Sequence, residues 1–109
     1  MQTIITILRP DTQPETHILD LPSIPEWSTI TTIIKPHIDG HIERVRVWHG
    51  GIYTNMFVDE DFQQKKLPYN AEATKVYRAN IVEHEPKTDP DSLGTILGNA
   101  VLFSRRVYF

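Results

Sequence analysis

A glycine pair between two alternating segments constrains the fold more than any other feature of the chain. Residues 41–48 and 52–58 each alternate in side-chain character, as β-strands do, and Gly50-Gly51 lies between them. A two-residue turn that requires positive φ angles is typical of a tight hairpin. The middle of the chain is therefore predicted to form two antiparallel strands.

Three further strands are predicted outside this hairpin. Residues 2–8 are β-branched and apolar on both alternating faces, which indicates a strand inside a sheet. Residues 17–21 form a short segment between Pro14 and Pro22 and complete an N-terminal hairpin. Near the other end of the chain, the apolar run at residues 100–103 predicts a buried strand.

A first helix is predicted to begin at residues 23–26 and to end at Pro36. Ser23-Ile24-Pro25-Glu26 fits a capping box, in which serine and glutamate satisfy backbone N–H groups at the helix start. Apolar residues then follow at helical spacing, namely Trp27, Ile30, Ile33 and Ile34. The β-branched side chains of residues 29–34 oppose a helix, because they lose rotamer freedom in it.

A second helix is predicted from Asn70, which can cap it, to about Asn80. Its apolar stripe consists of Ala73, Val76 and Tyr77. Residues 83–92 contain two prolines and four acids and predict a mobile loop. Residues 104–109 form a C-terminal tail.

Together these elements predict one α+β domain over residues 1–109. Two helices pack on a mostly antiparallel sheet of about five strands. The composition, with 39% hydrophobic and 23% charged residues, is that of an ordinary globular protein.

Composition and charge exclude several classes of protein. The chain has no cysteine, which excludes disulfide frameworks, thiolate zinc sites and cysteine nucleophiles. No apolar run approaches the roughly 20 residues that span a bilayer, and the N-terminus lacks the pattern of a secretion signal. The net charge of −3 disfavours direct nucleic-acid binding. We therefore expect a cytoplasmic protein.

No motif for catalysis is found in the sequence. The serines at positions 23, 28, 92 and 104 lack the Gly-x-Ser-x-Gly context of a nucleophile elbow. Gly94 and Gly98 do not form a phosphate-binding loop. These observations favour a non-catalytic binding protein without a cofactor.

The first candidate binding surface is basic and aromatic. Arg44, Arg46 and Trp48 share one face of a predicted strand, and Tyr53 or Asn55 can join them across the hairpin. Such a surface can stack on a base and grip a phosphate. The alternative is a solvent-exposed face on which arginine stems cover the tryptophan.

The second candidate is the acidic run Asp59, Glu60 and Asp61, which follows the hairpin. Carboxylates at this spacing can hold a hard cation or supply an acid and a base. The alternative is a solvated turn, and the glycine and glutamate of a calcium loop are absent.

Three histidines form a candidate metal site. His37 and His41 flank the Asp39-Gly40 turn, and His49 can supply a further ligand. With the acidic run they predict, as an alternative function, a metal-dependent hydrolase or nuclease. The opposing interpretation is that these histidines are surface residues.

Three segments carry a resemblance to a known family. They are Ile-Ile-Lys-Pro-His-Ile-Asp-Gly-His-Ile-Glu at residues 33–43, Phe-Val-Asp-Glu-Asp at 57–61 with Leu-Pro-Tyr-Asn-Ala-Glu-Ala-Thr at 67–74, and Ile-Leu-Gly-Asn-Ala-Val-Leu at 96–102. In this order they resemble small proteins of bacteriophages, plasmids and other mobile elements known as domain of unknown function 3846.

The resemblance implies a setting but no functional residues. Small accessory proteins of phages often act by binding, for example by inhibiting a defence system of the host. The expected partner is then a host protein or a small nucleotide-like ligand met in the host cytoplasm. A third alternative is a structural or assembly subunit, which would form a homo-oligomer through edge strands and the tail Val107-Tyr108-Phe109.

Overall fold

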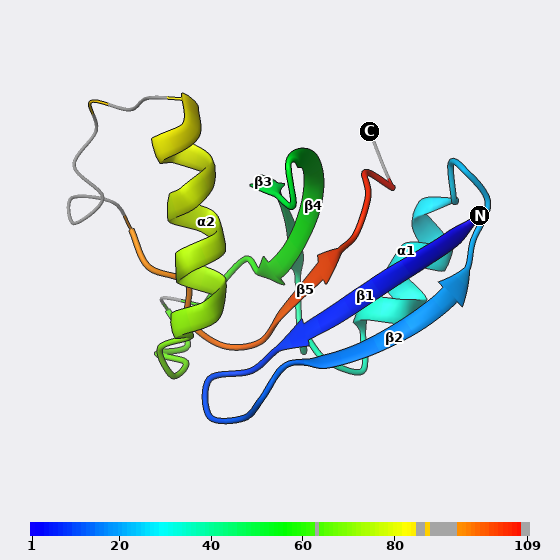
Figure 1. Ribbon diagram of the computed structural model, residues 1–109. Coiled ribbons are helices and arrows are strands. Elements are labelled where there is room, and N and C mark those ends of the chain that lie inside the picture. The colour runs from blue at the N-terminus through cyan, green and yellow to red at the C-terminus, as the bar shows by residue number, and fades with distance from the viewer. Residues whose placement is uncertain (63, 85–86, 88–93, 108–109) are drawn as a thin grey trace.

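The fold was described from a computed structural model, which covers residues 1–62, 64–84, 87 and 94–107. Its elements are β1 (Gln2–Leu8), β2 (Glu15–Asp20), α1 (Trp27–Ile34), β3 (Ile42–His49), β4 (Ile52–Asp59), α2 (Ala71–His84) and β5 (Ala100–Phe103). The strands form one antiparallel sheet in the order β2-β1-β5-β4-β3 (Figure 1). The predicted α+β class with a five-stranded sheet and two helices is confirmed.

Both predicted hairpins are present, and the last strand lies between them. Gln2 of β1 is opposite Asp20 of β2, and Ile42 of β3 is opposite Asp59 of β4. β5 pairs with β1 along one edge and with β4 along the other. The sheet is therefore continuous only because β5 bonds to both hairpins.

The two helices cover opposite faces of the sheet (Figure 1). One core cluster lies beneath α1 and consists of Ile5, Ile7, Leu21, Ile30, Ile34, Ile38, Phe57, Val101, Phe103 and Val107. The other lies beneath α2 and consists of Leu8, Val47, Met56, Val58, Ala73, Ile96, Ala100 and Leu102. Since alternate residues of a strand point to opposite faces, β1, β4 and β5 contribute to both clusters.

The predicted capping box at the start of α1 is wrong. Glu26 is the N-cap residue, and its side chain makes no capping hydrogen bond. Pro25 explains this, because a proline disfavours the helical conformation of the residue before it. The helix therefore cannot begin directly after Ser23, whose carbonyl oxygen instead accepts a hydrogen bond from Arg105.

The β-branched residues of α1 are accommodated by burial and by local hydrogen bonds. Ile30 and Ile34 are fully buried. The hydroxyls of Thr31 and Thr32 donate to the carbonyl oxygen of Ser28, which is a bond that threonine readily makes within a helix. Tertiary packing thus outweighs a weak local propensity.

Helix α2 begins as predicted and ends later than predicted. The Asn70 side-chain oxygen accepts the N–H of Ala73, which is an N-cap bond. The helix continues to His84 instead of Asn80, so Glu83 and His84 are helical. Apart from these two residues and Lys87, the predicted mobile loop 83–92 lies outside the described residues.

The tail after β5 is bound to the domain as far as it is described. Ser104 exchanges hydrogen bonds with the backbone of Ile4, and Arg105 donates to Thr3. Val107 is fully buried and donates its N–H to Asn55. Val107 therefore belongs to the core and is not available for the predicted oligomer contact, while residues 108 and 109 lie outside the described residues.

Candidate functional site

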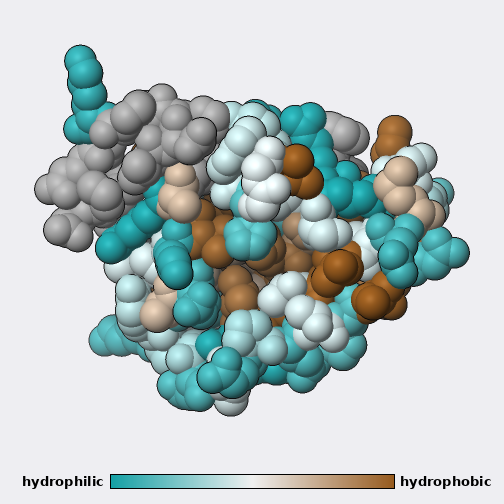
Figure 2. Space-filling view, viewed as in Figure 1, coloured by the Kyte–Doolittle hydropathy of each residue, from teal (hydrophilic) through white to brown (hydrophobic). Residues whose placement is uncertain are grey.

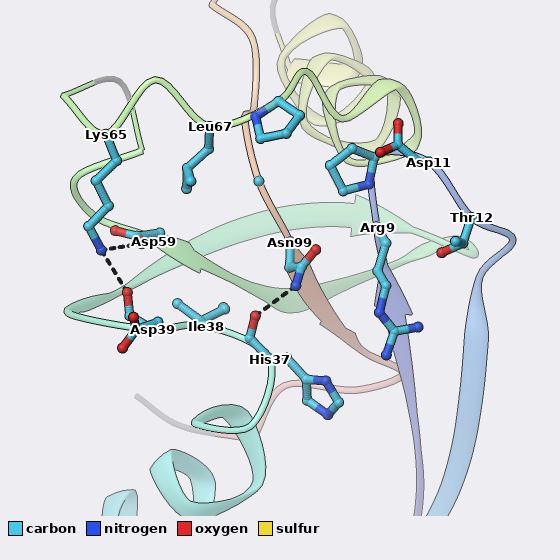
Figure 3. Close-up of a pocket in the computed structure, with 13 residues that line it drawn as sticks. Arg9, Asp11, Thr12, His37, Ile38, Asp39, Asp59, Lys65, Leu67 and Asn99 are labelled. Atoms are coloured by element: carbon cyan, nitrogen blue, oxygen red, sulfur yellow. Dashed lines mark hydrogen bonds and ion pairs between the residues drawn. The ribbon is translucent and has the colours of Figure 1, made fainter.

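A cavity of about 470 Å³ opens at one end of the sheet, where β1 and β4 end and β5 begins (Figure 3). Its walls come from the segments after β1, after α1 and before β5, and from the loop between β4 and α2. The lining residues are Arg9, Pro10, Asp11, Thr12, His37, Ile38, Asp39, Asp59, Lys65, Leu67, Pro68, Gly98 and Asn99. Small-molecule sites in proteins commonly have this size and mixed lining.

Lys65 ties together the segments on one side of the cavity. Its ammonium group donates to the carbonyl oxygen of Asp39 at 2.6 Å and to a carboxylate oxygen of Asp59 at 2.7 Å (Figure 3). The hydrogen bond to Asp59 raises the pKa of Lys65. Asp59 is buried, and its other oxygen accepts the N–H of Asp61. This ion pair holds these segments of the cavity wall together. The positive charge of Lys65 and the negative charge of Asp59 compensate each other.

The backbone before β5 closely approaches the loop between β4 and α2. Gly98 has a φ angle of +78° and donates its N–H to the carbonyl oxygen of Pro68 at 2.7 Å. A Cβ atom at Gly98 would lie 2.7 Å from a methyl group of Leu67. Next in the chain, Asn99 donates to the carbonyl oxygen of His37 at 2.9 Å. The positive φ angle thus favours glycine here, and a larger residue would also have to displace the Leu67 side chain.

Arg9 and His37 form the opposite wall. In Figure 3 the Arg9 side chain extends from the end of β1 toward the His37 ring. Arg9 lies 3.4 Å from one carboxylate oxygen of Glu15, whose other oxygen is 2.6 Å from His17. Burial, and then the charge of Arg9, lower the pKa of His37. This wall therefore presents a guanidinium group and a neutral imidazole.

The His37 imidazole has unused hydrogen-bonding capacity. Its backbone N–H and carbonyl are bonded to Ile34 and Asn99. By contrast, no hydrogen bond joins its ring to any other residue in the part of the chain that the structure describes. A half-buried imidazole in the wall of a cavity can therefore bond to a molecule inside it.

We expect the stability of the protein to depend on pH through His37. Its folded-state pKa is lowered below the usual value of about 6.5, so the unfolded state binds the proton more readily. The contribution of His37 to the free energy of unfolding should be fully present above its pKa in the unfolded state. It should decrease as the pH falls through this value toward the pKa of His37 in the folded state. Urea unfolding at pH 7.5 and 5.5 measures this loss, which should be smaller in His37→Asn. An equal loss in both proteins would contradict it.

The predicted basic and aromatic residues do gather, but away from the cavity. Trp48 packs edge-on against Tyr53 with ring centroids 5.0 Å apart, and the guanidinium carbon of Arg46 lies 5.9 Å from the Tyr53 ring centre. Arg44 lies on the same face of β3. Trp48 and Tyr53 lie near the Gly50-Gly51 turn, whereas the cavity is at the other end of this hairpin. Arg44 and Arg46 lie between them and do not line the cavity.

The predicted acidic run is divided. Asp59 lines the cavity and pairs with Lys65. Glu60 and Asp61 line a separate hollow of about 260 Å³ together with Glu43, Phe62 and Gln64. The seven predicted binding residues therefore do not form one continuous site.

The predicted histidine site is not assembled. His37 lines the cavity, His41 is exposed with its Nδ1 3.6 Å from Asp61, and His49 ends β3 at the other end of this strand. Across the described ranges, no three His, Asp or Glu side chains lie where they could hold a metal ion. The histidines are therefore parts of different surfaces.

Sequence reasoning missed Arg9, Lys65 and Asn99. Arg9 was visible as the basic residue directly after a predicted inner strand, a position from which side chains reach the end of a sheet. Lys65 and Asn99 gave no comparable signal, because the carbonyl groups of Asp39 and His37, to which they donate, are 26 and 62 residues away in the chain.

Comparisons with family models, with curated proteins and with solved structures found no significant match. The resemblance to the mobile-element family therefore remains a prediction. None of the described helices is long and apolar enough to cross a membrane. The function has to be inferred from the geometry and charge of the cavity.

Proposed function

We propose that this protein is a non-catalytic binding protein whose cavity takes a small anionic ligand with a flat or apolar part, such as a nucleotide. One observation carries the proposal: the Arg9 guanidinium and the His37 imidazole face the same cavity of about 470 Å³. Arginine recognises phosphate and carboxylate oxygens through charge-assisted hydrogen bonds. An anionic group of the ligand would lie against these two side chains.

The rest of the lining suits the remainder of such a ligand. Ile38, Leu67 and Pro68 offer apolar surface to a ring. Asp11 and Asp39 offer acceptors to amino or hydroxyl groups. Lys65 contributes less to anion binding than Arg9, since its 2.7 Å contact with the buried Asp59 is closer than the 3.4 Å contact of Arg9 with the exposed Glu15. Charge on one side and apolar surface on another is the usual division in small-molecule sites.

The resemblance to proteins of mobile elements supports a setting for this activity. A phage-encoded protein that sequesters a small nucleotide-like molecule can inhibit a host defence system that depends on it. Sequestration requires affinity and no chemistry, which fits a chain without a catalytic motif. The proposed role is therefore that of an accessory protein in the host cytoplasm.

We expect Arg9→Ala to weaken nucleotide binding at least tenfold. Loss of a charge-assisted hydrogen bond costs about 1.5–3 kcal/mol, and 1.4 kcal/mol corresponds to a factor of ten. Titration calorimetry of the intact protein with AMP, ADP and inorganic phosphate measures the change.

Arg44→Ala is the matched control, because Arg44 lies on the β3 surface and not in the cavity. It should bind like the unmodified protein. If Arg44→Ala weakened binding and Arg9→Ala did not, the ligand would lie on β3. If none of the three probes bound to the unmodified protein, the nucleotide-like class would be wrong.

A further inference from the structure

Strand β2 is an outer strand of the sheet, so the N–H and C=O groups of its alternate residues point away from the sheet. Leu21 donates its N–H to the carbonyl oxygen of Met1, so the two residues form a hydrogen-bonded pair. Such pairs alternate along an antiparallel ladder. The N–H and C=O groups of Thr16, Ile18 and Asp20 therefore point away from β1.

Independent bonds on the other side of β1 support this alternation. Ile4 is opposite Ile18, and its N–H and carbonyl are bonded to Ser104 on the β5 side. The N–H and carbonyl of Ile4 are therefore not bonded to β2. The N–H and carbonyl of Ile18, which is opposite Ile4, accordingly point away from β1.

The outward edge is complementary to itself. In an antiparallel pairing centred on Ile18, this residue meets Ile18 of a second copy, and Thr16 meets Asp20. All three outward residues then exchange hydrogen bonds, and no like charges stand opposite each other, which would destabilise the pairing. The threonine hydroxyl can also donate to the aspartate carboxylate.

The side chains at the centre of this pairing are apolar and exposed. Ile18 is 64% exposed and Ile4 is 42% exposed. Both lie on the α2 face of the sheet, because Ile4 shares its side of β1 with Leu8. Figure 2 shows apolar side chains on this face beside α2. A second copy would bring two Ile18 side chains together with an Ile4 on either side.

The other outer strand lacks this complementarity. Glu60 donates its N–H to the carbonyl oxygen of His41, so by the same alternation the outward groups of β3 belong to Ile42, Arg44, Arg46 and Trp48. An antiparallel self-pairing centred here would place arginines of the two copies opposite or beside each other. Charged side chains on an edge strand prevent such pairing.

We propose that two copies of this chain pair through β2, antiparallel and centred on Ile18, to form a ten-stranded sheet across a twofold axis. The contact is one strand wide and smaller than the roughly 1,200–2,000 Å² of stable interfaces. The dimer is therefore reversible and depends on protein concentration. This inference does not rest on the function proposed for the cavity.

Disulfide crosslinking tests the register. The chain has no cysteine, so Ile18→Cys introduces the only thiol. Hydrogen-bonded pairs have Cα atoms about 5.5 Å apart, within the range of about 4.4–6.8 Å that a disulfide spans. Oxidation at high concentration should convert most Ile18→Cys protein to a covalent dimer. Ile24→Cys is the matched control, since Ile24 is 69% exposed but lies outside β2, and it should stay mostly monomeric.

Sedimentation velocity across a range of concentrations tests the pairing itself. The mass of the unmodified protein should increase with concentration. Ile18→Lys should remain monomeric, while Ile24→Lys should behave like the unmodified protein. A monomer at all concentrations, or equal crosslinking of the two cysteine variants, would overturn the proposal.

Discussion

Replacing Asn70 by alanine is expected to lower the free energy of unfolding by about 3–5 kcal/mol. Asn70 is fully buried, and its amide nitrogen donates to the carbonyl oxygens of Leu8 at 2.9 Å and Gly98 at 2.7 Å. Its oxygen caps α2 at Ala73. Alanine would leave these three backbone groups without their partner in the interior. Chemical denaturation followed by circular dichroism measures the loss.

Asn99→Ala is the control for this prediction. Asn99 is half-buried and donates to His37, so water can replace part of what is lost. We expect a loss of about 1 kcal/mol, typical of one hydrogen bond. Similar losses in the two variants would mean that Asn70 does not have the special role assigned to it.

Phe57→Ala should be about as destabilising, at roughly 3–5 kcal/mol. The Phe57 ring is fully buried between the sheet and α1. It packs edge-on against Phe103 with centroids 5.3 Å apart and lies 5.9 Å from the Trp27 ring. The substitution removes both aromatic contacts and leaves a cavity where three elements meet. Thermal or urea unfolding gives the difference.

Phe62→Ala is the matched substitution, because Phe62 is half-buried in the loop after β4. It should lower the free energy of unfolding clearly less than Phe57→Ala does, since solvent can occupy the space that the Phe62 ring leaves. An equal cost would show that burial beneath α1 is not what makes Phe57 important.

The strands and helices could be predicted because their signals are local. Alternation around Gly50-Gly51 gave both strands of a hairpin, and residues 2–8 and 100–103 were found with the bounds that the structure has. The capping box failed because Pro25 acts on the residue before it, which the pattern ignores. The position of β5 between the hairpins could not be read, since strand order depends on contacts far apart in the chain.

The cavity could not be predicted, because its lining comes from segments that lie far apart in the chain. Alternation correctly placed Arg44, Arg46 and Trp48 on one face, but periodicity gives no information on what lies at the end of a sheet. Asp59 was read as part of an acidic run that could hold a cation or form a solvated turn, whereas in the structure it is buried and paired with Lys65. A charged side chain can be buried where a partner of opposite charge compensates it. Lys65 is six residues from Asp59 across a loop, and no sequence pattern predicts that the two side chains meet.

The central position of β5 has a consequence for how the chain folds. β1 and β5 pair across nearly the whole length of the chain, as in Ile5 with Phe103. Contacts between distant residues form slowly, because a long loop has to close before they contribute. The two hairpins can form early, each from neighbouring residues, but they share no ladder until the final strand enters between them. During synthesis, the sheet therefore stays in two pieces until β5 has been added.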